Sequence, residues 1–293
     1  MIGGKMISVL THMTRRMRRW STVFVTLFAL TACSSPQNDG PKLYVMDCGE
    51  ITFTDISFFS LKPEDTDIRT LFVPCYLITH QGKTLLWDVG LPLNIVGKGV
   101  VQPNGDAGPA MVYQRSVVDQ LADLNLAPDQ IDYLALSHMH YDHTGAANLF
   151  TRAKWLVQRS EYDAAFSASP PVAFVPDTYA ALKNNPTEIL EGDYDVFGDG
   201  SVTILSTPGH TPGHQMLLID LAKTGKVLLS GDLYHFRASR ALQAVPLFNT
   251  DIEQSKQSMA HIEDVIQKTG ATLWIEHDKE LAETLNMSPA FYD

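Results

Sequence analysis

The 293-residue sequence lacks features that several common functions require. Basic residues are few, with 22 Lys and Arg against 33 Asp and Glu. The resulting net charge of −11 argues against nucleic acid as a partner, because phosphate binding needs clustered basic side chains. No Gly-x-Ser-x-Gly sequence occurs, which weakens the hypothesis of a serine esterase. No apolar run reaches the roughly 20 residues of a comfortable membrane span.

Cysteine is also scarce, with three residues in the chain. Cys33 lies in the N-terminal region, so Cys48 and Cys75 are the remaining thiols. Two interpretations of this pair stay open. In an oxidising compartment the two residues could form a disulfide. Both also lie in predicted strands, which is equally typical of buried free thiols.

The N-terminal region has the pattern of a secretion signal. Five basic residues and no acidic residue precede Asp39, and an apolar run follows them over residues 20–30. A basic start, a short apolar stretch and small residues at its end are typical of an exported protein. Leu30-Thr31-Ala32-Cys33 resembles a bacterial lipoprotein signal, in which Cys33 is lipidated. An ordinary cleaved signal or an N-terminal membrane anchor is the alternative, and Met13 is a second plausible start.

These features predict three parts of the chain. Residues 1–32 are expected to be a lipoprotein-type signal peptide, residues 33–41 a flexible tether, and residues 42–293 the functional domain. The expected location is the bacterial cell envelope, with the domain in the periplasm and anchored by lipid to a membrane, the outer membrane in first place.

From residue 42 the sequence predicts strands first and an alternation of strands and helices later. Gln81-Gly82-Lys83 predicts a tight hairpin turn, and residues 90–108 predict a long loop. Strands are expected at 43–46, 51–59, 71–79, 84–89, 131–136, 155–158, 202–206, 215–220, 226–230 and 272–275. Helices are expected at 112–124, 161–166, 178–183 and 251–268. This order favours an α/β fold in which helices cover packed sheets.

Three histidines and one aspartate lie within six residues directly after the predicted strand 131–136. They are His138, His140, Asp142 and His143. At the end of a strand, the first two can project from one side while the others come from the turn. Imidazole and carboxylate groups both bind Zn²⁺ at about 2.0–2.2 Å, so this spacing favours two neighbouring metal ions over a solvent-exposed histidine-rich loop.

Three further segments place a polar residue directly after a predicted apolar strand. The residues are His210 with His214, then Asp232, then His277. Singly, a Gly-Asp pair is usually a turn and a lone histidine is usually a surface or core residue. Because all of them follow strand ends, we expect them to converge on one edge of the sheets, where active sites of layered folds commonly lie.

In this order, the segments resemble the metallo-β-lactamase superfamily. They read His-Met-His-Tyr-Asp-His at 138–143, Pro-Gly-His-Thr-Pro-Gly-His at 208–214, Leu-Ser-Gly-Asp at 229–232 and Ile-Glu-His-Asp at 275–278. Within the superfamily the chain most resembles the N-acyl homoserine lactonases, with supporting stretches at 75–77, 88–90, 158–162 and 191–194. The resemblance covers roughly residues 42–280 and implies an αββα sandwich of two mixed β-sheets flanked by helices.

The resemblance implies a role for each polar residue. His138, His140 and His210 would hold one metal ion. Asp142, His143 and His277 would hold a second ion, and the carboxylate of Asp232 would bridge the two. In the family pattern His210 is the ligand, and His214 then supports the site from behind. Asp88 would orient the site through hydrogen bonds, with a plain turn aspartate as its alternative.

The resemblance further implies a dinuclear metal-dependent hydrolase that opens lactone rings, with N-acyl homoserine lactones as substrates. The cofactors would be two divalent metal ions, Zn²⁺ in first place. A hydroxide that bridges the ions would attack the carbonyl carbon, and Asp142 would protonate the departing alkoxide. The alternatives are a glyoxalase-II-like thioesterase, an arylesterase, a β-lactamase and, more distantly, a non-catalytic metal-binding lipoprotein.

The sequence departs from the lactonase pattern at one position. The family has a tyrosine three residues after the bridging aspartate, where it contacts the substrate carbonyl. Here that position is His235, and Tyr234 comes one residue earlier. Either Tyr234 serves after a small backbone shift, His235 replaces the tyrosine, or the role is absent. We expect Tyr234 to be the catalytic residue.

Overall fold

The computed structural model describes Met1 and residues 40–103, 105 and 108–293. The predicted signal peptide apart from Met1, Cys33 and most of the predicted tether therefore lie outside the described residues. Among the described residues, no helix combines the length and the apolar character needed to cross a bilayer.

Two mixed β-sheets form the centre of the described part of the chain, and the two sheets pack face to face. The larger sheet has the strand order β4-β1-β2-β3-β5-β6-β7. Its strands are β1 (Lys42–Thr52), β2 (Thr70–His80), β3 (Lys83–Trp87), β4 (Ala110–Val112), β5 (Tyr133–Ala135), β6 (Lys154–Gln158) and β7 (Thr187–Leu190). Neighbours from β4 to β3 are antiparallel, and those from β3 to β7 are parallel.

The smaller sheet has the order β12-β11-β10-β9-β8. Its strands are β8 (Tyr194–Asp195), β9 (Val202–Ser206), β10 (Gln215–Leu221), β11 (Gly225–Leu229) and β12 (Thr272–Trp274). β12 runs parallel to β11, whereas the other neighbouring pairs are antiparallel.

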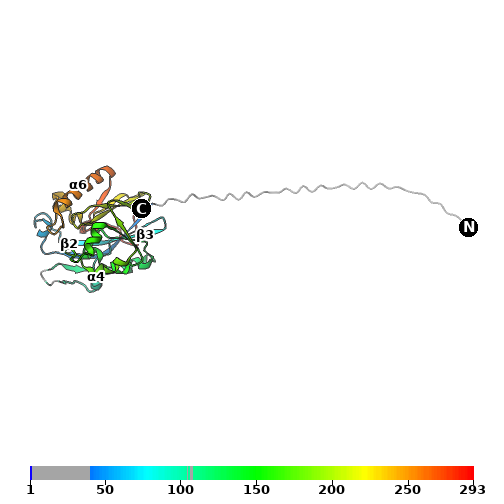
Figure 1. Cartoon of the computed structure of the whole chain (residues 1–293), viewed down its shortest axis with the longest axis horizontal. Coiled ribbons are helices and arrows are strands. Elements are labelled where there is room, and N and C mark those ends of the chain that lie inside the picture. The colour runs from blue at the N-terminus through cyan, green and yellow to red at the C-terminus, as the bar shows by residue number, and fades with distance from the viewer. Residues whose placement is uncertain (2–39, 104, 106–107) are drawn as a thin grey trace. The chain divides into compact units, whose positions relative to one another are not determined.

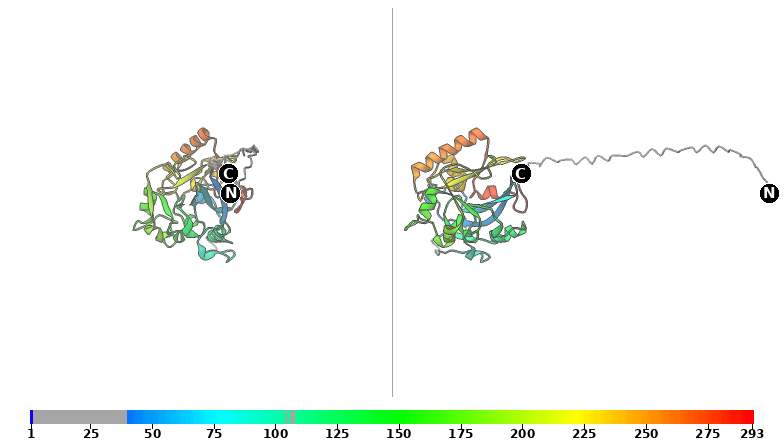
Figure 2. Two further views of the ribbon diagram at one scale, coloured as in Figure 1. Left: turned by 90° about the vertical axis from the view of Figure 1, so that its right-hand side faces the viewer. Right: turned by 45° about the vertical axis from the view of Figure 1, so that its right-hand side comes forward.

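Helices cover the outer face of each sheet, which completes the predicted αββα sandwich. Figure 1 shows α6 on one side of the strands and α4 on the other, with β2 and β3 between them. The helices are α1 (Val117–Asp123), α2 (Tyr141–Thr144), α3 (Arg159–Ala165), α4 (Pro176–Tyr179), α5 (Arg237–Leu242), α6 (Ile252–Thr269) and α7 (Lys279–Ala282). The right-hand view of Figure 2 shows α6 along the outer side of the yellow strands of the smaller sheet.

The strands are apolar on both faces because each sheet is covered on both sides. In β2, Tyr76 and Ile78 pack into the core between the sheets, where they meet Ile204 and Leu217 of the smaller sheet. The alternate residue Val73 faces the outer core of the larger sheet. A run of buried residues without a polar face is typical of such sandwiched strands.

Local sequence signals set the ends of the long helix α6. The side chain of Asp251 accepts a hydrogen bond from the backbone N–H of Gln254 at the N-terminus. Gly270 ends the helix in the left-handed conformation, with φ +70°. Met259 and Ile262 lie on the buried face, against the outer side of the smaller sheet.

Several sequence predictions differ from the structure. The strand expected at 51–59 ends at Thr52, because a separate aromatic cluster around Phe58 and Phe59 occupies the following turn. The helix expected at 112–124 begins at Val117, after Ser116 caps it, and residues 110–112 form β4 instead. The strands β7 and β8 and the helices α2, α5 and α7 were not predicted.

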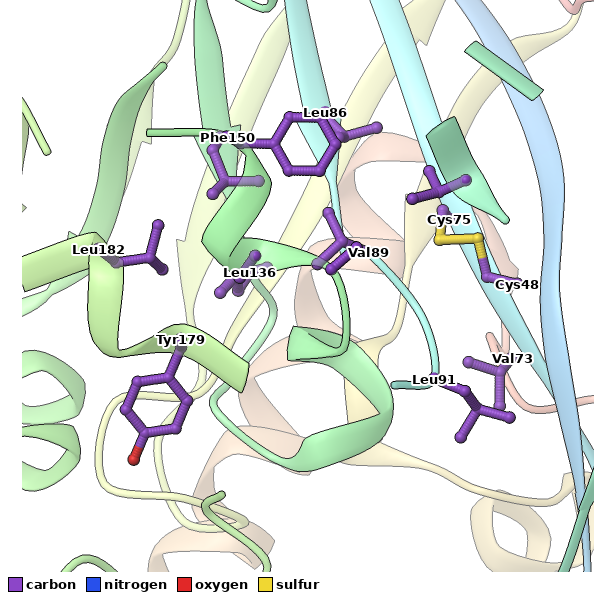
Figure 3. Close-up of a cluster of buried hydrophobic side chains, with 14 of the residues drawn as sticks. Cys48, Val73, Cys75, Leu86, Val89, Leu91, Leu136, Phe150, Tyr179 and Leu182 are labelled. Carbon is purple, nitrogen blue, oxygen red and sulfur yellow. A yellow bond between two sulfur atoms is a disulfide. The ribbon is translucent and has the colours of Figure 1, made fainter. Parts of the chain in front are cut away.

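A disulfide joins Cys48 of β1 to Cys75 of β2, so this alternative for the two thiols is confirmed. Figure 3 shows the bond in the outer core of the larger sheet, beside Val73 and Leu91. Gly90 packs directly on Cys48: a Cβ at Gly90 would lie 2.4 Å from the Cys48 Cβ, and its φ is +72°. The disulfide therefore supports the turn that follows β3.

Removing the disulfide should lower the stability of the fold. The bond closes a loop with a sequence separation of 27, for which the chain-entropy model gives about 3–4 kcal/mol. We expect a Cys48→Ala/Cys75→Ala variant to lose about 3 kcal/mol of unfolding free energy in guanidinium titrations. The reduced wild-type protein is the control and should unfold at the midpoint of the variant. Equal stability of the variant and the oxidised wild type would contradict this prediction.

Candidate metal centre

The seven predicted ligands all lie just beyond strand ends, and the structure brings them together. His138 and His140 follow β5, and Asp142 and His143 lie on α2. His210 lies in the loop between β9 and β10, Asp232 in a turn after β11, and His277 between β12 and α7. All seven side chains are buried.

Three of the histidines surround one oxygen of Asp232. Nε2 of His210 lies 3.2 Å from Nε2 of His138 and 3.1 Å from Nδ1 of His140. Oδ2 of Asp232 lies 3.2 Å from the same His210 nitrogen. These four residues offer ligand atoms that all lie within 4.8 Å of one another.

The other oxygen of Asp232 faces the second group. Oδ1 lies 2.8 Å from Nε2 of His277 and 3.3 Å from Nε2 of His143. Oδ2 of Asp142 lies 3.7 Å from the His143 nitrogen and 3.8 Å from the His277 nitrogen. The Asp232 carboxylate thus stands between the two groups with one oxygen toward each, which is the geometry of a bridging ligand.

These residues fit a pair of divalent metal ions. Two ligand atoms that are each about 2.0–2.2 Å from one metal lie roughly 3–3.5 Å apart, which agrees with most of the separations above. Nε2 of His143, Nε2 of His277 and Oδ1 of Asp232 are buried, and within the described part of the chain none of the three makes a hydrogen bond. Buried polar atoms normally have partners, and a metal ion would supply one to each of these three.

The electrostatics of the centre suit metal binding. Burial lowers the pKa of His138 and His140 well below the usual value for histidine, and the neighbouring imidazoles add to this effect. Both rings are therefore neutral, the form that binds metal. Burial alone would raise the pKa of Asp232, but the surrounding imidazoles, His277 first, hold that pKa well below its usual range.

His214 is not placed to bind metal because both of its ring nitrogens are engaged. Its Nδ1 lies 2.9 Å from the hydroxyl of Thr207, and its Nε2 accepts a hydrogen bond of 2.9 Å from the backbone N–H of Asp232. His214 therefore helps to position Asp232 through the backbone of that residue. A Cβ at Gly231 would lie 2.5 Å from the His214 ring, so glycine is needed for this approach.

Asp88 holds two parts of the histidine motif. Its Oδ2 lies 2.8 Å from Nδ1 of His143, and its Oδ1 accepts a hydrogen bond from the backbone N–H of Ser137. A carboxylate on the far nitrogen of a ligand histidine fixes the tautomer and the ring orientation. Asp88 is thus more than a turn residue, although it has φ +55°, a conformation for which aspartate is enriched.

Two buried glutamates that the sequence did not single out connect the ligand loops. Glu161 of α3 accepts hydrogen bonds from the backbone N–H groups of Met139 and Gly213, at 2.8 and 2.7 Å. Glu276 accepts hydrogen bonds from Gly231 N–H and from the Trp87 indole. Burial raises the pKa of Glu161 to about 7 and that of Glu276 to about 8. Their only sequence signal was their position inside or beside the motifs.

The structure corrects the expectation for Tyr234. Its hydroxyl donates to Glu263 of α6 at 3.1 Å, and its ring packs in the core under that helix. His235 points the other way, with Nε2 3.0 Å from Oδ2 of Asp232. Successive residues in an extended segment project to opposite sides, so only one of the two can reach the centre.

Comparison with known proteins agrees with this centre. The model of the metallo-beta-lactamase superfamily matches residues 68–264. The N-acyl homoserine lactonase AttM of Azorhizobium caulinodans is 32% identical over 242 residues, which cover 75% of this chain and 87% of that protein. The N-acyl homoserine lactonase AiiA of Bacillus thuringiensis subsp. kurstaki is 30% identical over 255 residues, with 85% and 98% covered.

Solved structures of such proteins are also similar. An N-acyl homoserine lactone hydrolase with N-hexanoyl-L-homoserine, its product, bound at the catalytic metal centre has a TM-score of 0.73 at 28% identity. The match covers 86% of this chain and 99% of that one. A variant of AiiA from B. thuringiensis with N-decanoyl-L-homoserine at its active site has the same TM-score, identity and coverage.

Single alanine substitutions of the two histidines in the 207–214 loop should show which one binds metal and which one only supports the site. We expect His210→Ala to lose one of two bound ions per chain. His214→Ala should keep both ions with affinity weakened about 10- to 100-fold, as is usual for a residue that supports a ligand. Metal content after dialysis, measured by mass spectrometry, checks both, and the exposed His261→Ala is the control. Full metal retention by His210→Ala would transfer the ligand role to His214.

Proposed function

This chain belongs to the metallo-beta-lactamase superfamily and, within it, to the N-acyl homoserine lactonases, and we propose that it opens the lactone ring of N-acyl homoserine lactones. The observation that carries this proposal is the gathering of six other buried ligand side chains around the two oxygens of Asp232. Similar proteins are N-acyl homoserine lactonases, and one solved structure of such a hydrolase holds its product at a catalytic metal centre. A quorum-quenching role follows from that activity.

The proposed chemistry assigns separate tasks to the metal pair and to the protein. Two divalent ions bound here would lower the pKa of a shared water molecule to near neutrality and polarise the substrate carbonyl. Asp232 and the histidines fix where these ions lie. Asp142 reaches into the same space from α2, with its Oδ2 3.8 Å from Nε2 of His277. A carboxyl group of this kind can carry the proton that the departing alkoxide needs.

Zinc is the metal that we propose for the centre. The ligand set is five imidazoles and two carboxylates, a combination of nitrogen and oxygen donors that suits Zn²⁺. Manganese, iron and cobalt accept the same donors less selectively, so the identity of the ion rests on availability as well as on the ligands.

A cavity next to the centre supports an acyl-chain substrate. It has a volume of about 760 Å³ and includes Tyr141, which lies between the ligands His140 and Asp142 in the sequence. Its wall is largely apolar, with Leu93, Ile95, Pro103, Met111, Leu149 and Val175 among the lining residues. A pocket of this size and polarity suits a small amphipathic ligand. We propose that the acyl chain enters here while the lactone ring lies at the metal pair.

We also propose that the protein works in the cell envelope, anchored by lipid at Cys33. The N-terminal sequence carries the signal pattern described above. The Cys48–Cys75 disulfide supports this location, because disulfides persist in oxidising compartments and are rare in the cytosol. An enzyme placed there would meet lactone signals as they cross the envelope.

A substrate panel on the metal-loaded protein tests the activity. We expect hydrolysis of N-acyl homoserine lactones with kcat/KM of at least about 10⁴ M⁻¹s⁻¹, and at least tenfold weaker activity on thioesters, aryl esters and β-lactams. KM should fall as the acyl chain lengthens, because the cavity buries more apolar surface. Chelator treatment and Asp232→Asn are the inactive controls. Turnover of β-lactams or thioesters without turnover of lactones would overturn the proposal.

Fractionation of cells tests the location. Wild-type protein should sediment with membranes and carry labelled fatty acid, whereas Cys33→Ser should lose the label because the lipid-accepting thiol is gone. Lactonase activity per folded molecule serves as the control and should be equal in both forms. Membrane retention and labelling of Cys33→Ser would show that another residue or segment anchors the protein.

A further inference from the structure

The turn after β3 lies between the disulfide and the metal centre. It consists of residues 88–91, and we call it the Asp88 turn. The Asp88 side chain meets the far nitrogen of the ligand His143 at 2.8 Å. At the other end of the turn, Leu91 lies beside Cys48 (Figure 3) and donates its backbone N–H to the Cys48 carbonyl at 3.3 Å. The disulfide and a ligand histidine therefore contact the same short segment.

The Asp88 turn is packed tightly against the ligand segment that follows β5. The backbone N–H of Val89 donates to the carbonyl of His143 at 2.9 Å. The backbone N–H of Gly145 donates to the carbonyl of Gly90 at 2.8 Å. No room remains between the two segments, because a Cβ at Gly145 would lie 2.1 Å from the carbonyl carbon of Leu91. A shift of the turn would therefore move the ligand segment with it.

On its other side, the turn rests on an irregular part of β1. The register of β1 against β2 shifts between Asp47 and Glu50, which is the pattern of a β-bulge. Cys48 lies in this interval, where a bulge interrupts the ladder of backbone hydrogen bonds. Pro74, the β2 partner of Asp47, has no N–H to donate. The bond from Cys48 to Cys75 therefore joins the two strands where their backbone pairing is weak.

The contacts of the Asp88 turn favour one group of ligands over the other. Its hydrogen bonds reach both the ring and the carbonyl of His143, which lies in the group of Asp142 and His277. Among the described residues, its hydrogen bonds approach the other group only beside His138, through the backbone N–H of Ser137. The ion held by His143, which we call the second ion, therefore depends most on where the turn lies.

We propose that the Cys48–Cys75 disulfide positions the second metal ion by holding the Asp88 turn against His143. Without the bond, the bulge can open and the turn can shift, so His143 samples several orientations before it binds. A ligand that is already in place needs no ordering when the ion arrives. Loss of a group that orients a ligand typically weakens metal binding about 10- to 100-fold. The proposal goes beyond lactone hydrolysis, because it concerns metal binding whichever ester the protein opens.

Removal of the disulfide from the full protein tests the positioning role. We expect Cys48→Ala/Cys75→Ala to raise the dissociation constant of one zinc ion about tenfold or more and that of the other less than about threefold. Competition with a chromophoric chelator measures both constants. Addition of His210→Ala or Asp142→Ala identifies the ion, since the first should leave the second ion bound and the second should remove it. The large effect should appear in the His210→Ala background alone.

Leu43→Ala is the matched control for a general loss of stability. Leu43 is fully buried at the start of β1, where it pairs with Ile78. It lies five residues from Cys48 along the strand, roughly 16 Å away. Truncation of a buried leucine should lower the unfolding free energy about as much as removal of the disulfide. We expect this variant to keep both zinc dissociation constants within about threefold of wild type.

A second variant and a second readout separate the covalent link from its packing. Cys48→Ala/Cys75→Val refills part of the space of the sulfur atoms, so it should fold more stably than the double alanine variant. It should show the same selective loss of zinc affinity, because it too lacks the bond. In the metal-free protein, hydrogen exchange at the backbone N–H groups of Val89 and Gly145 should be faster in both cysteine variants than in Leu43→Ala, since their turn opens more often.

Unchanged zinc affinities in the cysteine variants would overturn the proposal. Equal weakening of both ions, or the same weakening in Leu43→Ala, would overturn it as well, because the disulfide would then act only through overall stability. A wild-type protein that binds two ions but opens no lactone would refute the proposed function instead. The zinc and exchange measurements would still decide the role of the disulfide.

Discussion

The metal centre depends on one buried carboxylate, that of Asp232. It is 3% exposed, and its two oxygens face different groups of imidazoles. A negative charge away from water is stable only with close opposite charge or hydrogen bonds. Two cations between Asp232 and the surrounding histidines would satisfy the carboxylate and the orphaned ring nitrogens together. The same requirement explains why the ligands come from several strand ends, since no single loop could enclose a carboxylate from all sides.

Three further buried carboxylates fix the positions of those strand ends relative to one another. Asp88 connects the turn after β3 to His143, and Glu161 connects the loop after β5 to the loop before β10. Glu276 connects the turn that carries Asp232 to β3 through Trp87. Each carboxylate thus links separate segments of the chain, so the ligand geometry is set by cross-links between loops rather than by any loop alone. Such preorganisation is what a metal site needs.

Much of this architecture could be predicted from the sequence because strand ends carry the ligands. Apolar runs located most strands, and the polar residues directly after them named the side chains that gather around Asp232. The preference for His210 over His214 came from the resemblance to the lactonases. The orientation at residues 234 and 235 could not be predicted, because which side chain faces the centre depends on the backbone angles of one turn. Tyr234 was therefore chosen, although it packs under α6. The disulfide pairing was also undetermined, since two cysteines in neighbouring strands pair only if the register places them together.

One side of the cavity wall, formed by residues 92–111, contains no ligand. The segment after Leu91 is fastened at one end, where Leu91 N–H donates to Cys48 and Gly145 N–H donates to Gly90. At its other end β4 pairs with β1. No metal ligand lies between these attachments. Insertions, deletions or substitutions within residues 92–109 can therefore accumulate while the reactive centre is preserved, so lineages with one hydrolytic apparatus can diverge in the signals that they destroy.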